Sequence, residues 1–570
     1  MKKLLATKYW WIVLLALLVL VNYAASYLTV RADLTEEKRF TLSRPTKKML
    51  KGLDGQINIT VFLEGDLPKD FKKLRNSTTE LLQEFKEIAR GNIKYSYEKP
   101  GAGLNDSAKT YFLDSLARLG IRPYTIQAQV KEGEGSEERQ VVPGALVTYK
   151  DRVLAVDLLG GQSSDLDENS INRVEATLEY KFASTINKIT KDTVPMVGYL
   201  TGNGEPLSYN VYDLIGNNLK RNYAFSIFNI DSFPVIPAVF SAMVITKPTQ
   251  KFTDEQKLKL DQYTMHGGKL LWMIDNLYAE MDSLERSQNE FIAFDRGLNL
   301  EDLLFKYGVR INLDLVEDIN CDGYPSVIGT QGGKPQIKVL PFNYFPLLAN
   351  YNNHPIAKNL DYVVSQFPNS IDTVKAEGIQ KTILLATSDA TKILSSPAKV
   401  SFTELATQAN IATFNQKNVP VAVLLEGEFH SLYANRVSGA IRDSLAKGGS
   451  QFMPQTAASN KMIVIADGDI ALNAVTKNDG ALQMGVNPYT KYKYANSEFV
   501  MNCVEYLVDN SGILETRSKD LTLRLLDKKK LEAEKTKWQL INIIAPLLLV
   551  ILFGGIYQAM RKRKYSNASS

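Results

Sequence analysis

The sequence predicts an α/β protein in which two folded domains lie between two transmembrane helices. Three observations support this class. An uncharged apolar segment of about twenty residues, the length that crosses a bilayer, lies near each end of the chain. Between them, strands and helices alternate, first in a short β-α-β unit and then in a longer α/β series. The composition, 45% hydrophobic and 23% charged, is that of a folded globular protein.

Residues 9–28 form the first predicted transmembrane helix. They carry no charged side chain, and about twenty residues at about 1.5 Å each cross the hydrocarbon core. The alternative is a cleaved signal peptide, since Lys2 and Lys3 precede the segment and Ala24-Ala25-Ser26 offers small residues for processing. Residues 538–560 form the second predicted helix and are also uncharged.

Basic tails flank both predicted helices. Residues 1–8 contain three lysines, residues 561–570 contain four basic residues, and neither tail contains an acid. Without these seven, 60 basic and 62 acidic residues remain, so the body has no basic excess and is not expected to bind nucleic acid. The positive-inside rule predicts that both tails are cytoplasmic and that the body lies outside the cytoplasm.

Residues 29–160 are predicted to form a thioredoxin-like β-α-β domain with a β-hairpin. Its expected elements are a helix at 45–52 capped by Ser43, a strand at 57–63, a helix at 70–90, a strand at 93–97 and a hairpin over 141–159. No cysteine lies in this segment, which excludes redox chemistry there. Residues 161–192 are expected to be a connector helix.

Residues 193–510 are predicted to form a larger α/β domain. The expected strands are 196–200, 225–230, 239–245 and 269–274, the expected helices are 211–221, 254–265 and 300–307, and 382–386, 421–425 and 462–466 should continue the sheet. This alternation is typical of a doubly wound, Rossmann/flavodoxin-like parallel sheet. Residues 277–298 and 321–370 are expected to be insertions outside the core, and 511–537 a membrane-proximal helix.

Polar residues follow three of these strands, at the edge where α/β sheets bind ligands. Gly202-Asn203-Gly204-Glu205 follows the first strand, Asp275 closes another, and Asp467-Gly468-Asp469 follows a third. Together they could line a crevice for a cation or a polar ligand. The candidate ligand-binding residues are Gly202, Gly204, Glu205, Asp275, Asp467 and Asp469. A tight turn at the glycines and capping of helices by the acids are the competing interpretations.

The chain lacks the usual catalytic and cofactor motifs. The glycine turn has neither the third glycine of a dinucleotide site nor the lysine of a phosphate loop. The three histidines are scattered and form no metal-binding pair. We therefore predict no enzyme activity, no catalytic residue, no metal site and no cofactor. Cys321 and Cys503 are predicted to be unpaired thiols, with a single disulfide as the alternative.

Several short motifs run from the first helix to the last. They are Asp33-Leu34-Thr35, Arg39-Phe40-Thr41-Leu42-Ser43, Val61-Phe62 with Gly65-Asp66-Leu67-Pro68, Leu200-Thr201-Gly202-Asn203-Gly204-Glu205, and Gly267-Gly268-Lys269-Leu270-Leu271 before Asp275. In these motifs the chain resembles the ABC-transporter auxiliary proteins, with the GldG family of bacterial gliding motility as the nearest group. The resemblance implies an inner-membrane, substrate-binding subunit that works with a separate ATP-binding subunit and a separate permease subunit.

The residues and the resemblance together predict a non-catalytic auxiliary subunit of an ABC transporter that serves gliding motility and linked protein secretion. It would cross the inner membrane twice, contact the lipid bilayer, and hold its large region in the periplasm. Two other interpretations stay open. One is a structural scaffold of the gliding or secretion machinery. The other is a degenerate glutamine-amidotransferase-like enzyme, for which the sequence shows no activated nucleophile.

Overall fold

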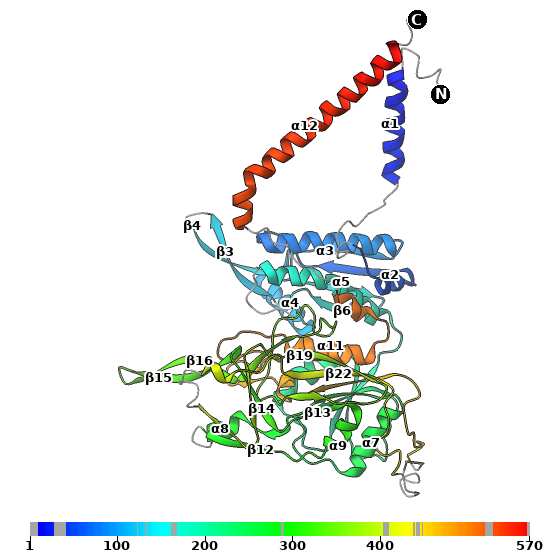
Figure 1. The fold of residues 1–570 in the computed structure, drawn as a ribbon. Coiled ribbons are helices and arrows are strands. Elements are labelled where there is room, and N and C mark those ends of the chain that lie inside the picture. Colours follow the sequence, from blue (N-terminus) through cyan, green and yellow to red (C-terminus); the bar gives the residue numbers. More distant parts are fainter. Residues whose placement is uncertain are drawn as a thin grey trace. The chain divides into compact units, whose positions relative to one another are not determined.

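A computed structural model describes residues 10–27, 41–121, 123–131, 134–160, 168–286, 290–402, 410–436, 439, 445–446, 448–518 and 528–566. The chain divides into two compact units, residues 1–520 and 521–570. The predictions made for residues 1–8 and 33–40 and for the amphipathic segment 521–527 fall outside the described residues. The larger unit contains two lobes, which we define as residues 41–190 and residues 194–518 (Figure 1).

The first lobe is built on a four-stranded sheet in the order β2-β1-β5-β6. β1 is parallel to β2 and antiparallel to β5, and β5 and β6 form the predicted hairpin. The elements of the lobe are α2 (Arg44–Lys51), β1 (Ile57–Val61), α3 (Lys69–Ile88), β2 (Ile93–Tyr97), α4 (Asp106–Leu119), β3 (Tyr124–Lys131), β4 (Glu134–Val141), β5 (Gly144–Tyr149), β6 (Arg152–Asp157) and α5 (Glu168–Thr190).

Local signals in the sequence position several of these elements. The Ser43 side chain accepts a hydrogen bond from the Thr46 backbone N–H at the start of α2, and Gly52 follows its end, as predicted. The 3–4-residue spacing of apolar side chains in α3 buries one face of this helix, including Phe71, Leu74 and Phe85. The hairpin β3–β4 was not predicted.

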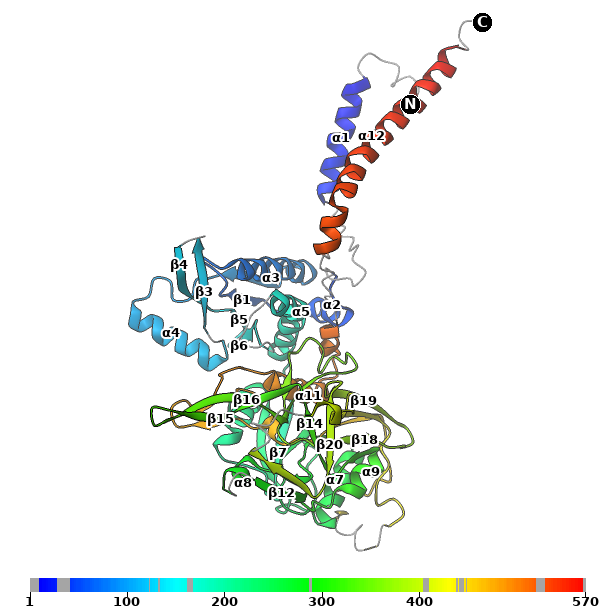
Figure 2. The same cartoon turned by 60° about the vertical axis from the view of Figure 1, so that its left-hand side comes forward.

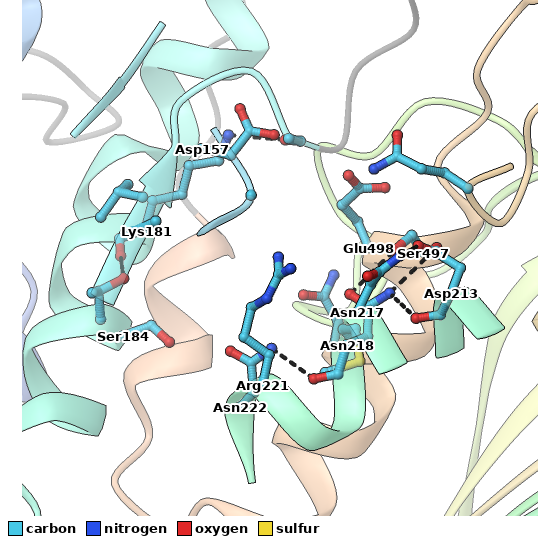
Figure 3. Close-up of a pocket in the computed structure, with 18 of the residues that line it drawn as sticks. Asp157, Lys181, Ser184, Asp213, Asn217, Asn218, Arg221, Asn222, Ser497 and Glu498 are labelled. Atoms are coloured by element: carbon cyan, nitrogen blue, oxygen red, sulfur yellow. Dashed lines mark hydrogen bonds between the residues drawn. The ribbon is translucent and has the colours of Figure 1, made fainter. Parts of the chain in front are cut away.

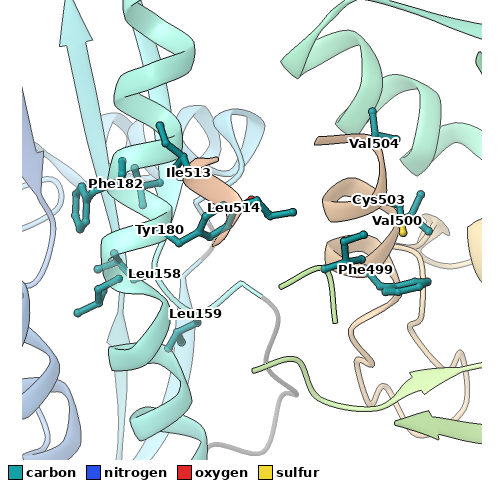
Figure 4. Packing of buried hydrophobic residues seen from close by; sticks show 14 of the residues in the cluster. Leu158, Leu159, Tyr180, Phe182, Phe499, Val500, Cys503, Val504, Ile513 and Leu514 are labelled. Atoms are coloured by element: carbon teal, nitrogen blue, oxygen red, sulfur yellow. The ribbon is translucent and has the colours of Figure 1, made fainter. Parts of the chain in front are cut away.

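The helix α5 is part of the packing rather than a bare connector. It contacts α2, α3, β5 and β6 of the first lobe and also the short helix η6 (Ile513–Ser518) of the second lobe. One buried apolar cluster runs through both lobes at this place. Figure 4 shows Tyr180 and Phe182 on α5, with Ile513 and Leu514 beside them, while Cys503 lies on the facing helix α11 (Asn496–Val508).

The second lobe contains the main sheet, and five of its strands are parallel, in the order β8-β7-β9-β10-β23. The order along the chain reverses between β7 and β9. The elements of this half are β7 (Met196–Thr201), η1 (Tyr209–Val211), η2 (Asp213–Leu219), α6 (Lys220–Asn222), β8 (Ala224–Asn229), β9 (Phe240–Thr246), α7 (Asp254–Met265), β10 (Lys269–Met273), β23 (Asn460–Ile465) and η5 (Asp469–Ala471).

The other half of the main sheet corrects the expectation of a parallel sheet. β22 (Pro420–Gly427) is antiparallel to β23, β19 (Ile379–Ala386) is antiparallel to β22, and β16 (Lys334–Asn350) continues the sheet in the same antiparallel sense. Between β16 and β22 the described elements are strands and one 3₁₀ turn, so the chain returns without the crossover helix that parallel pairing requires. The α/β class is confirmed, but the sheet is mixed.

The segment 321–370, expected to be an insertion outside the core, also belongs to the structure of the sheet. β15 (Cys321–Gln331) and β16 form a long hairpin whose second strand joins the sheet through Ala349 and Asn350. Phe342, Tyr344 and Phe345 are buried in a satellite core. Gly332 and Gly333 lie in the turn between the two strands, and the apolar residues of β16 follow later in the segment.

Smaller elements complete the second lobe. They are β11 (Leu277–Tyr278), α8 (Met281–Arg286), β12 (Glu290–Asp295), α9 (Glu301–Tyr307), β13 (Val309–Ile311), β14 (Asp314–Asp318), β17 (Val363–Val364), β18 (Ile371–Thr373), β20 (Thr391–Ser395), β21 (Ala398–Ser401), η4 (Ile411–Thr413), β24 (Val475–Thr476) and β25 (Gly480–Ala481). Segment 277–298 thus supplies two strands and a helix.

A helix lies near each end of the chain. α1 (Trp10–Tyr27) contains no charged residue. α12 (Lys528–Ser566) includes Glu534–Arg563, the one helix among the described residues that is long and apolar enough to cross a membrane. Its apolar side chains are exposed. Cys321 and Cys503 carry free thiols, which confirms that prediction.

Candidate functional site

The structure gathers three of the six predicted site residues at one place. Asp275 follows β10 and Asp467 and Asp469 follow β23, and one oxygen of each carboxylate lies within 4.8 Å of the others. We call these three residues the acidic cluster. Lys247, which follows β9, places its ammonium 2.6 Å from Asp469 and 3.1 Å from Asp275. The ammonium is also 3.1 Å from the Glu280 carboxylate.

Backbone groups take up most of the remaining carboxylate oxygens. The Asp467 side chain accepts hydrogen bonds from the backbone N–H groups of Asp469, at 2.7 Å, and Gln366, at 2.9 Å. Asp275 accepts one from the Gly468 N–H. Asp467 thus forms a local turn before the short helix η5, whose N-cap is Gly468, so the helix-capping interpretation of these acids is not met in its ordinary form.

Burial and crowding of charge shift the proton affinities of the acidic cluster. Burial raises the pKa of Asp467 well above the ordinary carboxyl value, and the charges of Asp469 and Asp275 raise it further. Burial also raises the pKa of Asp469, to about 7, against the opposing charge of Lys247. Burial lowers the pKa of Lys247, but the surrounding carboxylates outweigh it and hold this pKa well above its usual value. The ammonium supplies the positive charge that a metal ion would bring, so the cluster acts as a clamp joining the ends of three strands.

The other three predicted residues form a separate tight turn after β7. Gly202 and Gly204 have φ values of +128° and +78°, which favour glycine. A Cβ on Gly204 would lie 2.1 Å from the Thr249 hydroxyl oxygen, so the turn packs closely on the segment that follows β9. The Glu205 carboxylate accepts a hydrogen bond from the Asn203 N–H at 2.8 Å, and burial raises its pKa to about 7.

The turn occupies the point where the strand order reverses, which is the usual ligand position in such sheets. In this protein the loop after β7 and the loop after β9 contact each other at that position. The N–H groups of Thr249 and Gln250 both donate hydrogen bonds to the Asn203 carbonyl. The turn and the acidic cluster each contact the segment after β9, Gly204 through Thr249 and Gly468 through Lys247. The tight-turn interpretation of the glycines therefore fits the described contacts.

A larger cavity, which we call the inter-lobe pocket, lies where the two lobes meet. It has a volume of about 840 Å³ and is lined by residues of α4, β6, α5, η2, α6, α11 and η6. In Figure 3, Lys181 and Ser184 face it from α5, and Asn217, Asn218 and Arg221 face it from the second lobe. A cavity of roughly 300–1,000 Å³ at a junction between domains is the usual setting of a ligand site.

The wall of this pocket on the second lobe is a π-helix, η2. Asp213 is buried at its start and accepts hydrogen bonds from the side-chain amides of Asn217, at 2.8 Å, and Asn218, at 3.3 Å. Asn218 also donates to the Asp213 carbonyl at 2.8 Å. The Asn218 side chain thus provides a hydrogen bond to a backbone carbonyl of the π-helix. Such helices occur frequently at functional sites. The sequence predicted an ordinary helix here.

The lining of the inter-lobe pocket is rich in charge of both signs. Lys181 donates to the carbonyls of Leu158, at 2.5 Å, and Gly160, at 2.9 Å, and burial lowers its pKa to about 8. Burial raises the pKa of Asp157. Arg517 donates to the Asn502 side chain at 2.8 Å, while its Nε atom is buried with no hydrogen-bond partner in the described part of the chain.

Six basic and five acidic residues line this pocket, so it suits a polar ligand that carries charge. They are Arg118, Lys181, Lys188, Arg221, Lys493 and Arg517, and Asp114, Asp157, Asp213, Glu498 and Glu505. None belongs to the predicted set of site residues. The sequence did contain one indication of this pocket, a polar face on the helix α5. The residues of this face follow a 3–4-residue spacing and are Thr177, Tyr180, Lys181, Ser184 and Lys188.

Two solved structures are distantly similar to the chain. The mmIFT52 N-terminal domain is 15% identical with a TM-score of 0.29, over 55% of this chain and 98% of that chain. The exo-beta-1,4-mannosidase Op5Man5 from Opitutaceae bacterium strain TAV5 is 10% identical with a TM-score of 0.20, over 69% of this chain and 44% of that chain. No curated protein matches the chain.

Family profiles match both lobes. Residues 36–148 match a domain family of unknown function, DUF7088. Residues 194–503 match the family described as an ABC-type uncharacterized transport system, and this match covers more than half of the chain and nearly all of the second lobe. The chain therefore belongs to the auxiliary family of ABC-type transport systems.

Proposed function

We propose that this chain is a non-catalytic, membrane-anchored subunit of an ABC transporter that binds a polar ligand in the inter-lobe pocket. The observation that carries the proposal is the pocket itself, a charged cavity of about 840 Å³ with a π-helical wall inside the family domain. The chain has no phosphate loop, so ATP hydrolysis would reside in a separate ATP-binding subunit, and translocation in a separate permease subunit.

The proposal includes two membrane spans. α12 has the length and hydropathy of a span, and α1 is an uncharged helix that the sequence extends over residues 9–28. The basic tails beyond both helices favour the cytoplasm, which would leave the lobes in the periplasm of the inner membrane. Protease added to intact spheroplasts should then digest the lobes. Digestion only in inside-out vesicles contradicts this topology.

The motif resemblance to the GldG family supports a role in gliding motility and linked protein secretion. On this proposal, the first lobe is thioredoxin-like, since β1-α3-β2 is followed by the antiparallel pair β5–β6 and by α5. The parallel half of the main sheet is flavodoxin-like in its strand order. Purification from membranes in mild detergent should recover an ATP-binding subunit and a permease with the chain.

The pocket can be tested separately from assembly. Ala117→Phe places a ring in the inter-lobe pocket without removing a side-chain hydrogen bond, whereas Ile292→Phe changes an exposed side chain on β12 that lines none of the described pockets. Both variants should co-purify with the transporter subunits, but only Ala117→Phe should abolish secretion and gliding in the native host. Full activity of the Ala117→Phe variant contradicts a ligand role for the pocket.

A scaffold function is the second candidate, and the β15–β16 hairpin favours it. This hairpin extends from the second lobe in Figures 1 and 2. Val327, Ile328 and Ile337 are 61%, 54% and 66% exposed on it, which is unusual for a projecting pair of strands without a partner. A Val327→Ser/Ile337→Ser variant that loses envelope proteins in a pull-down but keeps the permease would favour the scaffold.

A further inference from the structure

A second cavity lies beside the inter-lobe pocket and differs from it in chemistry. It has a volume of about 490 Å³ and is lined by the start of β6, the end of α5, the segment leading into β7, the residues at the start of β8 and the end of α11. We call it the apolar pocket. Its wall includes Val153, Leu154, Ile189, Val194 and Val508. Val153 and Val194 are 44% and 42% exposed, so apolar side chains reach the surface at its mouth.

One polar atom in this wall lacks a partner. Tyr223 lines the apolar pocket and is only 6% exposed, and its hydroxyl makes no hydrogen bond with any described residue. Burial raises the pKa of this hydroxyl well above its ordinary value, so it stays protonated and remains a donor. Buried hydroxyl groups normally find an acceptor, and a bound molecule with an oxygen acceptor would provide one.

Charged residues surround the apolar lining, and they favour an anion. Four basic residues and two acids line the pocket, namely Arg152, Lys188, Lys191, Arg221, Glu505 and Asp509. Lys188 is paired with Glu505 at 2.6 Å, and Lys191 with Asp509 at 2.7 Å. Arg152 instead donates to two backbone carbonyls, those of Ile189 at 3.2 Å and Lys191 at 2.8 Å. Arg152 therefore supplies a positive charge at this pocket whose described hydrogen bonds go to neutral carbonyls.

We propose that the apolar pocket binds a single-chain amphipathic anion, a carboxylate on a hydrocarbon chain. The chain lies against the valine, leucine and isoleucine wall, an oxygen of the ligand accepts the Tyr223 hydrogen bond, and the basic residues hold the negative charge. This chemistry differs from that of the inter-lobe pocket, although Lys188 and Glu505 line both cavities. The inference does not depend on the transporter assignment, because binding needs this chain alone.

The test uses the full chain in phosphatidylcholine nanodiscs and a photoreactive dodecanoate that carries a diazirine and an alkyne. Labelling should be saturable, should map to peptides containing residues 187–195, 223–224 or 508–509, and should be competed by dodecanoate more strongly than by dodecylamine. Labelling of the terminal helices is expected to be unsaturable, because the probe also dissolves in the bilayer. Saturable labelling that is absent, or equally competed by the amine, overturns the proposal.

Three variants make the test specific. Val153→Trp obstructs the mouth at an exposed position and should remove the saturable labelling, whereas Ile292→Trp, at an exposed position on β12 outside the pocket, should not. Tyr223→Phe deletes only the hydroxyl and should weaken the affinity about three- to ten-fold, as expected for one hydrogen bond. Unchanged labelling in Val153→Trp, or unchanged affinity in Tyr223→Phe with the fold intact by circular dichroism, contradicts the proposed site.

Discussion

The substitution Lys247→Met tests whether the acidic cluster is a structural clamp. Methionine is unbranched like lysine and one atom shorter, and it adds no β-branch, so it should accept the positive φ of +44° about as well as lysine does. It removes the ammonium that lies 2.6 Å from Asp469 and 3.1 Å from both Asp275 and Glu280. The change therefore leaves Asp275 and Asp469 without their counter-charge, whereas Glu280 keeps its ion pair with Arg296 at 2.8 Å.

The loss of folding stability expected for Lys247→Met follows from the burial of the ion pairs. The Lys247 side chain is 7% exposed and that of Asp275 is 5% exposed, so solvent screens the pair little. Removing one partner of such a pair destabilises the folded state by about 3–5 kcal/mol. The exposed pair of Lys399 and Glu290, with side chains 64% and 54% exposed, provides the control, and Lys399→Met should cost less than about 1 kcal/mol.

The destabilisation should depend on pH. Without the ammonium, the pKa values of Asp467 and Asp469 should rise above those of the native protein, in which burial already raises them. A carboxyl group with a raised pKa binds a proton on folding, and the associated stability is lost as pH rises from the unfolded pKa through the folded one. For Asp469 this window runs from the ordinary value of 3.8 to about 7 or higher. The cost of Lys247→Met should therefore be largest near pH 8 and smaller near pH 5.

The assay is urea unfolding of the full chain in detergent, followed by the fluorescence of Trp272. This residue is fully buried on β10, close in sequence to Asp275, and the other tryptophans, Trp10, Trp11 and Trp538, can be replaced by phenylalanine in the background. Adding Asp469→Asn to Lys247→Met should recover part of the lost stability, because it removes one unpaired charge. A cost below about 1 kcal/mol at pH 8, or one that does not change with pH, would refute the clamp.

Four further outcomes follow from the described contacts. Glu205→Gln should stabilise the fold by up to about 3 kcal/mol at pH 8 and little at pH 4.5. Burial raises the pKa of Glu205 from 4.5 to about 7, so the native protein loses stability as pH rises across that window. Urea unfolding at both pH values measures the difference. Gly204→Ala, which would clash with Thr249, should lower the unfolding free energy by more than Gly267→Ala, where nothing lies within 4 Å and about 1 kcal/mol of backbone strain is expected. Isotope-edited NMR of methylated amines, with the Lys181 signal assigned by its loss in Lys181→Arg, should show Lys181 titrating near pH 8, and a titration near 10.5 would contradict its burial. Ser43→Ala should cost about 1 kcal/mol in the same unfolding assay through loss of the cap of α2.

Elements with local signals were predictable from the sequence. The helix expected at 254–265 is observed at Asp254–Met265, because Thr253 and Gln256 form a capping box at its start and Gly267 follows its end. The direction of β22 was not predictable, since it depends on a pairing with β23 that local periodicity does not encode. The π-helix was not predicted for a similar reason. The hydrogen-bond partners of Asp213 include Asn473 and Met484, which are distant in sequence.

The candidate site shows the same division between local and distant information. Strand-end acids can be found by their position in the sequence, so Asp275, Asp467 and Asp469 were expected to meet. Their counter-charge was not, because Lys247 follows a different strand and reaches the cluster only in the folded sheet. The inter-lobe pocket was missed entirely, since its lining combines α5 and η2 with α11, which lies far away along the chain.

The junction of the lobes limits how a ligand in either pocket could act. Glu505 accepts hydrogen bonds from Ser184 and Lys188, each at 2.6 Å, and thus ties α11 to α5 between the two cavities. Beside this contact the buried cluster runs through both lobes, so separating them would expose Tyr180, Ile513 and Leu514 to water. A wide hinge opening would therefore be costly. Ligand binding is instead expected to rearrange the side chains around Glu505, and a spin-label distance between the lobes should change little on binding, whereas a shift of several ångströms would indicate a hinge.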